Sequence, residues 1–295
     1  MIISHENEFI FFKPLKSAGS SIEFALGNQC GKNDILTGSP YRDEIEAGYQ
    51  DRNNEIVRRL VGQQAKDYLI REKGSFNPPP QVLLKDFYID AIEGIYNTHI
   101  TPVRFFEINK GNGIFDNYKT ISIVRNPWDA LVSFYWWSSS DKVMARKDGD
   151  SIMDLGIDES AMLPGLRGRC DDSPQMLRRK FNLFLKTKTN PLQPLASSKN
   201  LQESGRDTVL NHFSKIMNEF YHYKNFDFIL RFENLQEDYD KLCLSLLLTT
   251  AHLPRLKSVE RKSKMPFHEY YTEESKKMVE DLFADLISEQ GYRFN

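Results

Sequence analysis

The sequence predicts an α/β fold in which helices flank a parallel sheet. Short apolar runs that suit buried strands alternate with long helical or irregular stretches, and this alternation is typical of a parallel sheet with covering helices. Two of the runs pass directly into a loop or cap and then a helix, an arrangement with which proteins often bind phosphate. The expected strands cover residues 9–13, 82–87, 120–125 and 226–232.

The first strand leads into a loop that suits an anion. Phe9 to Phe12 is a continuous apolar run, as expected of a strand covered on both faces, and Pro14 ends it. The loop consists of Lys16, Ser17, Ala18, Gly19, Ser20 and Ser21. Its small side chains let backbone N–H groups approach an anion, which the positive N-terminal end of the following helix also attracts. Because lysine precedes glycine, the loop differs from the GxxxxGK[ST] nucleotide motif, and by itself such a turn is often only a connector.

The strand at residues 120–125 leads into a second ligand-binding arrangement. It ends in Arg125, after which Asn126 is suited to cap a helix and Pro127 to occupy the first helical position. Ser133 lies about two helical turns after the cap. Arg125 and Ser133 are therefore expected to face one ligand together.

These two motifs resemble those of the sulfotransferases that use 3′-phosphoadenosine 5′-phosphosulfate (PAPS), in particular the carbohydrate-type branch. The family's phosphosulfate loop reads Pro-Lys-Thr-Ala-Gly-Thr-Ser, and residues 16–21 match it from the lysine onward. The family's 3′-phosphate motif reads Arg-Asn-Pro-Trp/Tyr-Asp-Arg-Leu-Val-Ser-x-Tyr, and residues 125–135 match it. Leu15 stands where the family has proline, and Ala130 replaces its second arginine. Neither departure removes a group that must contact the donor.

The resemblance continues toward the C-terminus. Residues 226–235 look like the family's late strand and the helix after it, and residues 269–294 look like its closing helix and terminal Gly-Tyr-x-Phe. The resemblance implies one sulfotransferase domain over residues 1–295, with a P-loop NTPase-like sheet and helical insertions at about 32–95 and 138–205.

The resemblance also implies how the donor PAPS is held. The backbone of residues 16–21 and the Lys16 ammonium bind the 5′-phosphosulfate. Lys16 then stabilises the charge that grows on the bridging oxygen as the S–O bond breaks. Arg125 and Ser133 bind the 3′-phosphate.

A basic segment near the C-terminus is a further candidate for donor binding. Residues 253–264 include Arg261 and Lys262 and carry a clear excess of basic side chains. Most such clusters of basic residues form solvent-exposed loops without a ligand. In the family that this chain resembles, a basic loop at this place closes over the nucleotide, so we expect Arg261 and Lys262 to contact it.

Sulfuryl transfer to a hydroxyl also requires a base for the acceptor proton, and a group that titrates near neutrality does this best. The family often places its catalytic histidine between the two donor motifs, in a His-hydrophobic-Thr/Ser setting. His99, followed by Ile100 and Thr101, matches that setting. Without the resemblance, a lone histidine is more often a core or surface residue.

Composition narrows the class of protein. The net charge of −2 argues against a general nucleic-acid binder. No apolar run approaches the ~20 residues of a membrane helix, and the N-terminal sequence lacks a secretory signal, so we expect a cytoplasmic protein. The three cysteines and six histidines show neither a disulfide framework nor a metal-ligand spacing, so no metal is expected.

The sequence thus predicts a soluble, PAPS-dependent sulfotransferase that acts on a hydroxyl acceptor. A glycan is the family-level expectation, and other alcohols remain open. Two alternatives are a P-loop nucleotide-dependent kinase, which would need Mg²⁺, and a non-catalytic nucleotide-binding protein. Trp136 and Trp137 could contact a sugar acceptor, although aromatic residues late in a core helix more often pack.

Overall fold

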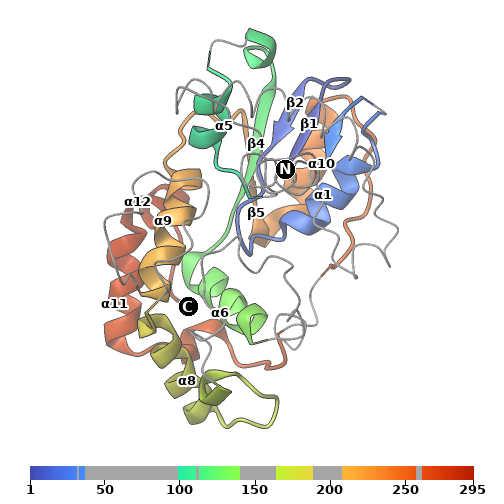
Figure 1. Cartoon of the computed structure of the whole chain (residues 1–295). Helices are drawn as coiled ribbons and strands as arrows, with labels where there is room; N and C mark the ends of the chain where they lie inside the picture. Colours follow the sequence, from blue (N-terminus) through green and yellow to red (C-terminus); the bar gives the residue numbers. More distant parts are fainter. Residues whose placement is uncertain (32, 37–98, 111–112, 140–163, 189–207, 257–260) are drawn as a thin grey trace, which may run out of the picture. The chain divides into compact units, whose positions relative to one another are not determined.

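The computed structural model describes residues 1–31, 33–36, 99–110, 113–139, 164–188, 208–256 and 261–295 (Figure 1). These residues belong to two compact units. Unit 1 takes Met1–Pro14, Ala18–Val124 and Tyr223–Leu256. Unit 2 takes Leu15–Ser17, Arg125–His222 and Lys257–Asn295. The strand expected at residues 82–87 and most of both expected insertions lie outside the described residues.

Unit 1 contains a five-stranded sheet in the order β3-β1-β2-β4-β5. Its strands are β1 (Ile2–Ser4), β2 (Phe9–Phe11), β3 (Ile35–Leu36), β4 (Lys119–Val124) and β5 (Phe228–Arg231). β4 pairs in parallel with β2 and with β5, whereas β1 pairs antiparallel with both β2 and β3. Four of these five strands therefore run in one direction. The expected α/β fold with a mostly parallel sheet is confirmed, and so are the strands expected near residues 9–13, 120–125 and 226–232.

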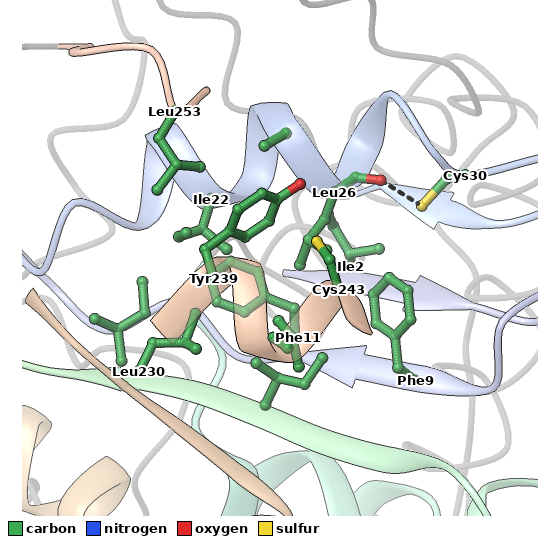
Figure 2. Close-up of a cluster of buried hydrophobic side chains, with 14 of the residues drawn as sticks. Ile2, Phe9, Phe11, Ile22, Leu26, Cys30, Leu230, Tyr239, Cys243 and Leu253 are labelled. Atoms are coloured by element: carbon green, nitrogen blue, oxygen red, sulfur yellow. Dashed lines mark hydrogen bonds between the residues drawn. The ribbon is translucent and has the colours of Figure 1, made fainter. Parts of the chain in front are cut away.

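Helices cover both faces of this sheet. On one face, α1 (Gly19–Gly27) and α10 (Leu235–Ser245) bury Ile22 and Tyr239 against Phe11 and Leu230 of the strands (Figure 2). On the other, Phe12 packs edge-to-face against Phe105 of α5 (Pro102–Ile108), with ring centroids 5.5 Å apart. Each fully buried ring of this kind contributes about 1.5–3 kcal/mol to folding. Two short 3-10 helices, η1 (Gly113–Phe115) and η6 (Phe232–Asn234), complete the described part of unit 1.

The described part of unit 2 is helical. Its helices are α6 (Pro127–Ser138), α8 (Pro174–Lys186), α9 (Val209–Tyr221), α11 (Glu273–Leu282) and α12 (Ala284–Gln290), with short 3-10 turns η4 (Pro164–Leu166) and η7 (Phe267–Tyr270). Aromatic side chains join them: Tyr135 of α6 packs against Phe181 and Phe184 of α8, with centroids 5.6 and 5.4 Å apart. Trp136 is buried and its indole N–H donates to the Tyr270 hydroxyl at 3.0 Å. The packing interpretation of Trp136 is therefore confirmed.

The closing helix expected within residues 269–294 is not one helix, because the chain forms α11 and α12 there. Thr272 starts α11 with a capping box to Ser275. At Phe283 the backbone leaves the helical region, with φ −123° and ψ 25°, while its side chain stays buried. Gly291 then ends α12 at a positive φ of 66°, which glycine adopts without strain. Val279, Phe283 and Leu286 are all buried, so an apolar stripe at helical spacing continues through the break, which is why the sequence pattern did not reveal it.

Candidate functional site

The loop between β2 and α1 contains two strained residues. Lys16 and Ala18 have positive φ values of 56° and 64°. The left-handed region costs a non-glycine residue about 1–2 kcal/mol, and such strain persists where the surroundings impose it, often at ligand sites. The backbone N–H of Ser21 donates to the Ala18 carbonyl at 3.0 Å and so closes the turn into α1.

Gly19 follows directly and allows a close approach within unit 1. A Cβ atom added at this position would lie 2.4 Å from Cγ of Lys13, well inside contact distance. Since the Lys13 ammonium is held by Glu23 at 2.5 Å, the lysine stem cannot easily swing away. The sequence therefore needs glycine at the first position of α1 for a packing reason, independent of any ligand.

Lys13 and Glu23 form a buried charge cluster that the sequence did not suggest. Their side chains are only 4% and 2% exposed, and Glu23 also accepts from the Met1 amino group at 2.9 Å. Burial alone would raise the pKa of Glu23, but the positive charges of Lys13 and the amino group outweigh it and lower that pKa to about 2. The sequence did contain two signals of this pair: Lys13 follows an apolar strand, and Glu23 lies on an otherwise apolar face of a helix.

His99 contacts the start of this loop. Its Nδ1 lies 2.7 Å from the main-chain carbonyl oxygen of Lys13. Burial, followed by the charge of Lys13, lowers the pKa of His99 to about 3. The imidazole is therefore neutral near pH 7, which makes it able to accept a proton but weaker as a base than a group that titrates near neutrality.

The two sequence motifs meet in unit 2 through Arg125. Its Nη1 donates to the main-chain carbonyl oxygen of Lys16 at 2.5 Å. Its Nε and Nη2 donate to Oδ2 of Asp129 at 3.0 and 2.6 Å. Arg125 is buried, and its place directly before the cap of α6 is fixed by Asn126, whose side chain accepts from the N–H groups of Trp128 and Asp129. The predicted cap and the proline at the first helical position are thus confirmed.

Arg261 joins the same group of charges. Its Nη1 donates to Oδ1 of Asp129 at 3.0 Å, and its Nη2 donates to the Met265 carbonyl at 2.6 Å. The guanidinium also lies over the Tyr270 ring, 5.7 Å from its centroid. Asp129 is therefore the residue that sequence reasoning missed here, although an Arg–Asp pair four residues apart at a helix start was a usable signal.

Lys16 contacts α6, the helix that also carries Ser133. The Lys16 ammonium lies over the Trp137 ring, 5.4 Å from its centroid. Ser133 is half-buried and one helical turn before Trp137, so both residues lie on one face of α6. Three of the predicted donor-binding residues, Lys16, Arg125 and Arg261, are thus linked by contacts within unit 2, and Ser133 lies in the same unit on α6.

The remaining predicted residues differ in exposure. Ser17 and Ser21 are buried, Ala18 and Ser20 are half-buried, and Lys262 is exposed beside Arg261. Ser17 lies in unit 2, while Ala18 through Ser21 lie in unit 1 with His99. Within the described residues, no three His, Cys, Asp or Glu side chains gather in a way that could hold a metal ion. No helix among them has the length and apolar character needed to cross a bilayer.

Comparison with known proteins adds no relative: no family model, no curated protein and no solved structure matches the chain. The resemblance to PAPS sulfotransferases therefore rests on the sequence motifs alone.

Proposed function

We propose that this protein transfers a sulfuryl group from PAPS to a hydroxyl-bearing acceptor. The observation that carries the proposal is the 2.5 Å hydrogen bond from Arg125 to the carbonyl of Lys16. It joins a phosphosulfate-type loop to a 3′-phosphate-type motif, and these elements lie far apart in the sequence. A donor with phosphate groups at two ends requires just such a pair.

The charge of this region suits the donor. Lys16, Arg125, Arg261 and Lys262 supply positive charge, and Asp129 compensates part of it. PAPS carries several negative charges, which guanidinium and ammonium groups bind through charge-assisted hydrogen bonds. Arg125 and Ser133 would bind the 3′-phosphate, and Lys16 with the backbone of residues 16–21 would bind the 5′-phosphosulfate.

The proposed reaction is an in-line displacement at sulfur. The acceptor oxygen forms a bond to sulfur while the bond between sulfur and the bridging oxygen breaks. The sulfuryl group ends on the acceptor, and the electron pair of the broken bond stays on the phosphate of the departing nucleotide. Lys16 stabilises that charge, because a preorganised cation at a developing negative charge lowers the barrier. The acceptor proton passes to His99.

The fold that the proposal implies is P-loop-like, with β2, the following loop and α1 as the phosphate-binding unit. Two features support it: the parallel pairing of β2 with β4, and a loop with two left-handed residues, Lys16 and Ala18, directly before a helix start. Arg261 and Lys262 would contribute to the nucleotide cover, while residues 257–260 of the basic segment lie outside the described residues. A glycan remains the proposed acceptor class.

The experiment is a transfer assay with sulfur-labelled PAPS and a panel of glycan and alcohol acceptors, in the presence of EDTA. We expect labelled product from the unmodified protein. Lys16→Ala should lower turnover by roughly two to three orders of magnitude, the scale seen when a preorganised transition-state donor is removed. Alanine keeps the Cβ that the left-handed backbone already tolerates, so this substitution isolates the ammonium.

The matched control is Lys277→Ala, because Lys277 is an exposed lysine of α11 paired only at the surface with Asp281. It should keep full turnover. Near-normal turnover in folded Lys16→Ala would remove the lysine from the mechanism. A parallel assay uses ATP labelled in its γ-phosphate, with Mg²⁺. Labelled product that forms there and disappears when EDTA is added would instead favour the kinase. Nucleotide binding without any product would favour a non-catalytic protein.

A further inference from the structure

Asp129 holds two arginines that come from distant parts of the sequence. Its Oδ2 accepts from Arg125 at 2.6 and 3.0 Å, and its Oδ1 accepts from Arg261 at 3.0 Å. The three side chains are 17%, 10% and 29% exposed in that order. The carboxylate thus uses both oxygens on guanidinium groups, in a partly desolvated setting where charge-assisted bonds are strong.

We propose that Asp129 is a positioning residue that prearranges Arg125 and Arg261 as a pair of guanidinium groups for one phosphate of the donor. This inference rests on the proposed function, since it assigns that phosphate to the 3′ position of PAPS. It goes beyond that function by giving a role to an acidic residue in an otherwise cationic site, where simple electrostatics would disfavour it.

Each arginine is held at two ends, which fixes the planes of both guanidinium groups. Arg125 is fixed between Asp129 and the Lys16 carbonyl, and Arg261 between Asp129 and the Met265 carbonyl. Two guanidinium groups that both contact one carboxylate are close enough to repel each other, and the negative charge of the carboxylate offsets much of that repulsion. Because both guanidinium groups are already ordered, the binding of a phosphate loses less side-chain entropy.

Asp129 also connects Arg261 to α6 within unit 2. Besides the nearby Met265 carbonyl, the Arg261 guanidinium contacts the Tyr270 ring and Asp129. Asp129 lies on the first turn of α6, four residues after Arg125, so the carboxylate has a rigid base. A donor phosphate that binds between the arginines would therefore contact both guanidinium groups without rearranging either side chain.

The neutral variant Asp129→Asn separates positioning from plain charge. Removal of a negative charge should tighten the binding of an anion if charge alone matters. If Asp129 positions the arginines, Asp129→Asn should weaken the binding of 3′-phosphoadenosine 5′-phosphate about tenfold or more, the scale of one lost charge-assisted bond. AMP, which lacks the 3′-phosphate, should lose less than about threefold. Asp129→Glu should recover part of the loss.

The matched control is Asp172→Asn, which makes the same change of charge in unit 2. Asp172 pairs with Lys180 at 2.7 Å and is 11% exposed, close to the exposure of Asp129. It should leave the ratio of the two nucleotide affinities unchanged. Titration calorimetry on the whole protein measures both affinities, and circular dichroism checks that each variant is folded.

The outcomes distinguish this inference from the proposed function. If the unmodified protein shows no preference for the 3′-phosphorylated nucleotide, the proposed function fails first. If that preference exists and Asp129→Asn leaves it unchanged or strengthens it, the positioning role is wrong while the function stands. Should Asp129→Asn not fold, Arg261→Lys tests the same link, because it keeps the charge and loses the fork to Asp129 and Met265. It should reduce the preference by more than about threefold, and an unchanged preference would overturn the inference.

Discussion

Nδ1 of the His99 imidazole lies 2.7 Å from the main-chain carbonyl oxygen of Lys13. A carbonyl oxygen can only accept a hydrogen bond, so in the neutral ring Nδ1 carries the proton and Nε2 carries the lone pair. In this tautomer Nε2 is the atom that would accept a proton, and the contact fixes the ring at the start of the loop that holds Lys16. His99, one of the two residues proposed for catalysis, thus contacts the main chain three residues before the other, Lys16.

The first prediction concerns catalysis by His99. Replacement by alanine should lower kcat by about 10²–10⁴, the usual contribution of a general base, with little change in the affinity for 3′-phosphoadenosine 5′-phosphate. Because the pKa of His99 is lowered to about 3, protonation of this residue should not reduce kcat/KM of the unmodified protein as the pH falls through 6.5. Transfer rates over pH 5–8 check both statements. Loss of nucleotide binding in the variant would make His99 structural.

A second prediction concerns stability. The pKa of His99 is about 6.5 when unfolded and about 3 when folded, so below pH 6.5 the unfolded chain binds one more proton. The stability linked to His99 is therefore complete above pH 6.5 and is lost as the pH falls toward 3. Between pH 7.5 and 5.0, the free energy of unfolding should fall less in His99→Gln than in the unmodified protein, by up to about 2 kcal/mol.

Denaturant titrations at the two pH values measure this difference. Glu23 does not interfere, because its pKa is lowered from 4.5 to about 2 and its contribution is lost only below pH 4.5. The same pH dependence in both proteins would show that His99 is not buried in its neutral form.

Donor selectivity is the subject of the third prediction. The protein should bind 3′-phosphoadenosine 5′-phosphate at least about tenfold more tightly than AMP, because one charge-assisted bond to the extra phosphate converts to that ratio. Arg125→Ala should remove most of the preference and leave the AMP affinity nearly unchanged. Arg231→Ala is the control, since Arg231 also ends a strand and pairs with an aspartate, Asp238, but lies outside the motif. Equal affinities in the unmodified protein would contradict the sulfotransferase assignment.

A fourth prediction uses two neighbouring residues of the loop. Ala18→Gly should raise the free energy of unfolding by up to about 1 kcal/mol, because glycine adopts the φ of 64° without strain. Gly19→Ala should lower it by about 1–3 kcal/mol, because the new Cβ would overlap the Lys13 stem. Thermal unfolding of both variants checks the opposite signs, and a loss of stability in Ala18→Gly would mean that the left-handed turn is not strained.

Much of the sheet could be predicted from local pattern alone. β2, β4 and β5 lie in apolar runs bounded by turn residues or charges, and these runs are enough to identify strands, although only Leu230 of β5 is buried. β1 and β3 have only three and two residues, too few for any periodicity, and depend on their pairing with β2 and with each other. The break at Phe283 is hidden because its apolar side chain continues the stripe of the preceding helix.

The candidate site could be predicted only in part, for a related reason. The loop at residues 16–21 and the cap at Asn126 depend on neighbours in the sequence, so their residue types are informative. The roles of Asp129 and Glu23 depend on Arg261 and Lys13, which other parts of the chain bring to them. Sequence patterns assign charged residues to the surface by default, and a buried ion pair becomes visible only when both partners are placed.

The cysteines give each unit its own chemical reporter. Cys30 and Cys243 lie within the core of unit 1 (Figure 2), and burial raises the pKa of the Cys243 thiol, whereas Cys170 in unit 2 is exposed. A thiol reagent should therefore modify Cys170 at once and reach the other two only when the sheet opens. The slow alkylation rate would measure the opening free energy of unit 1 in the native protein, without denaturant and without any introduced label.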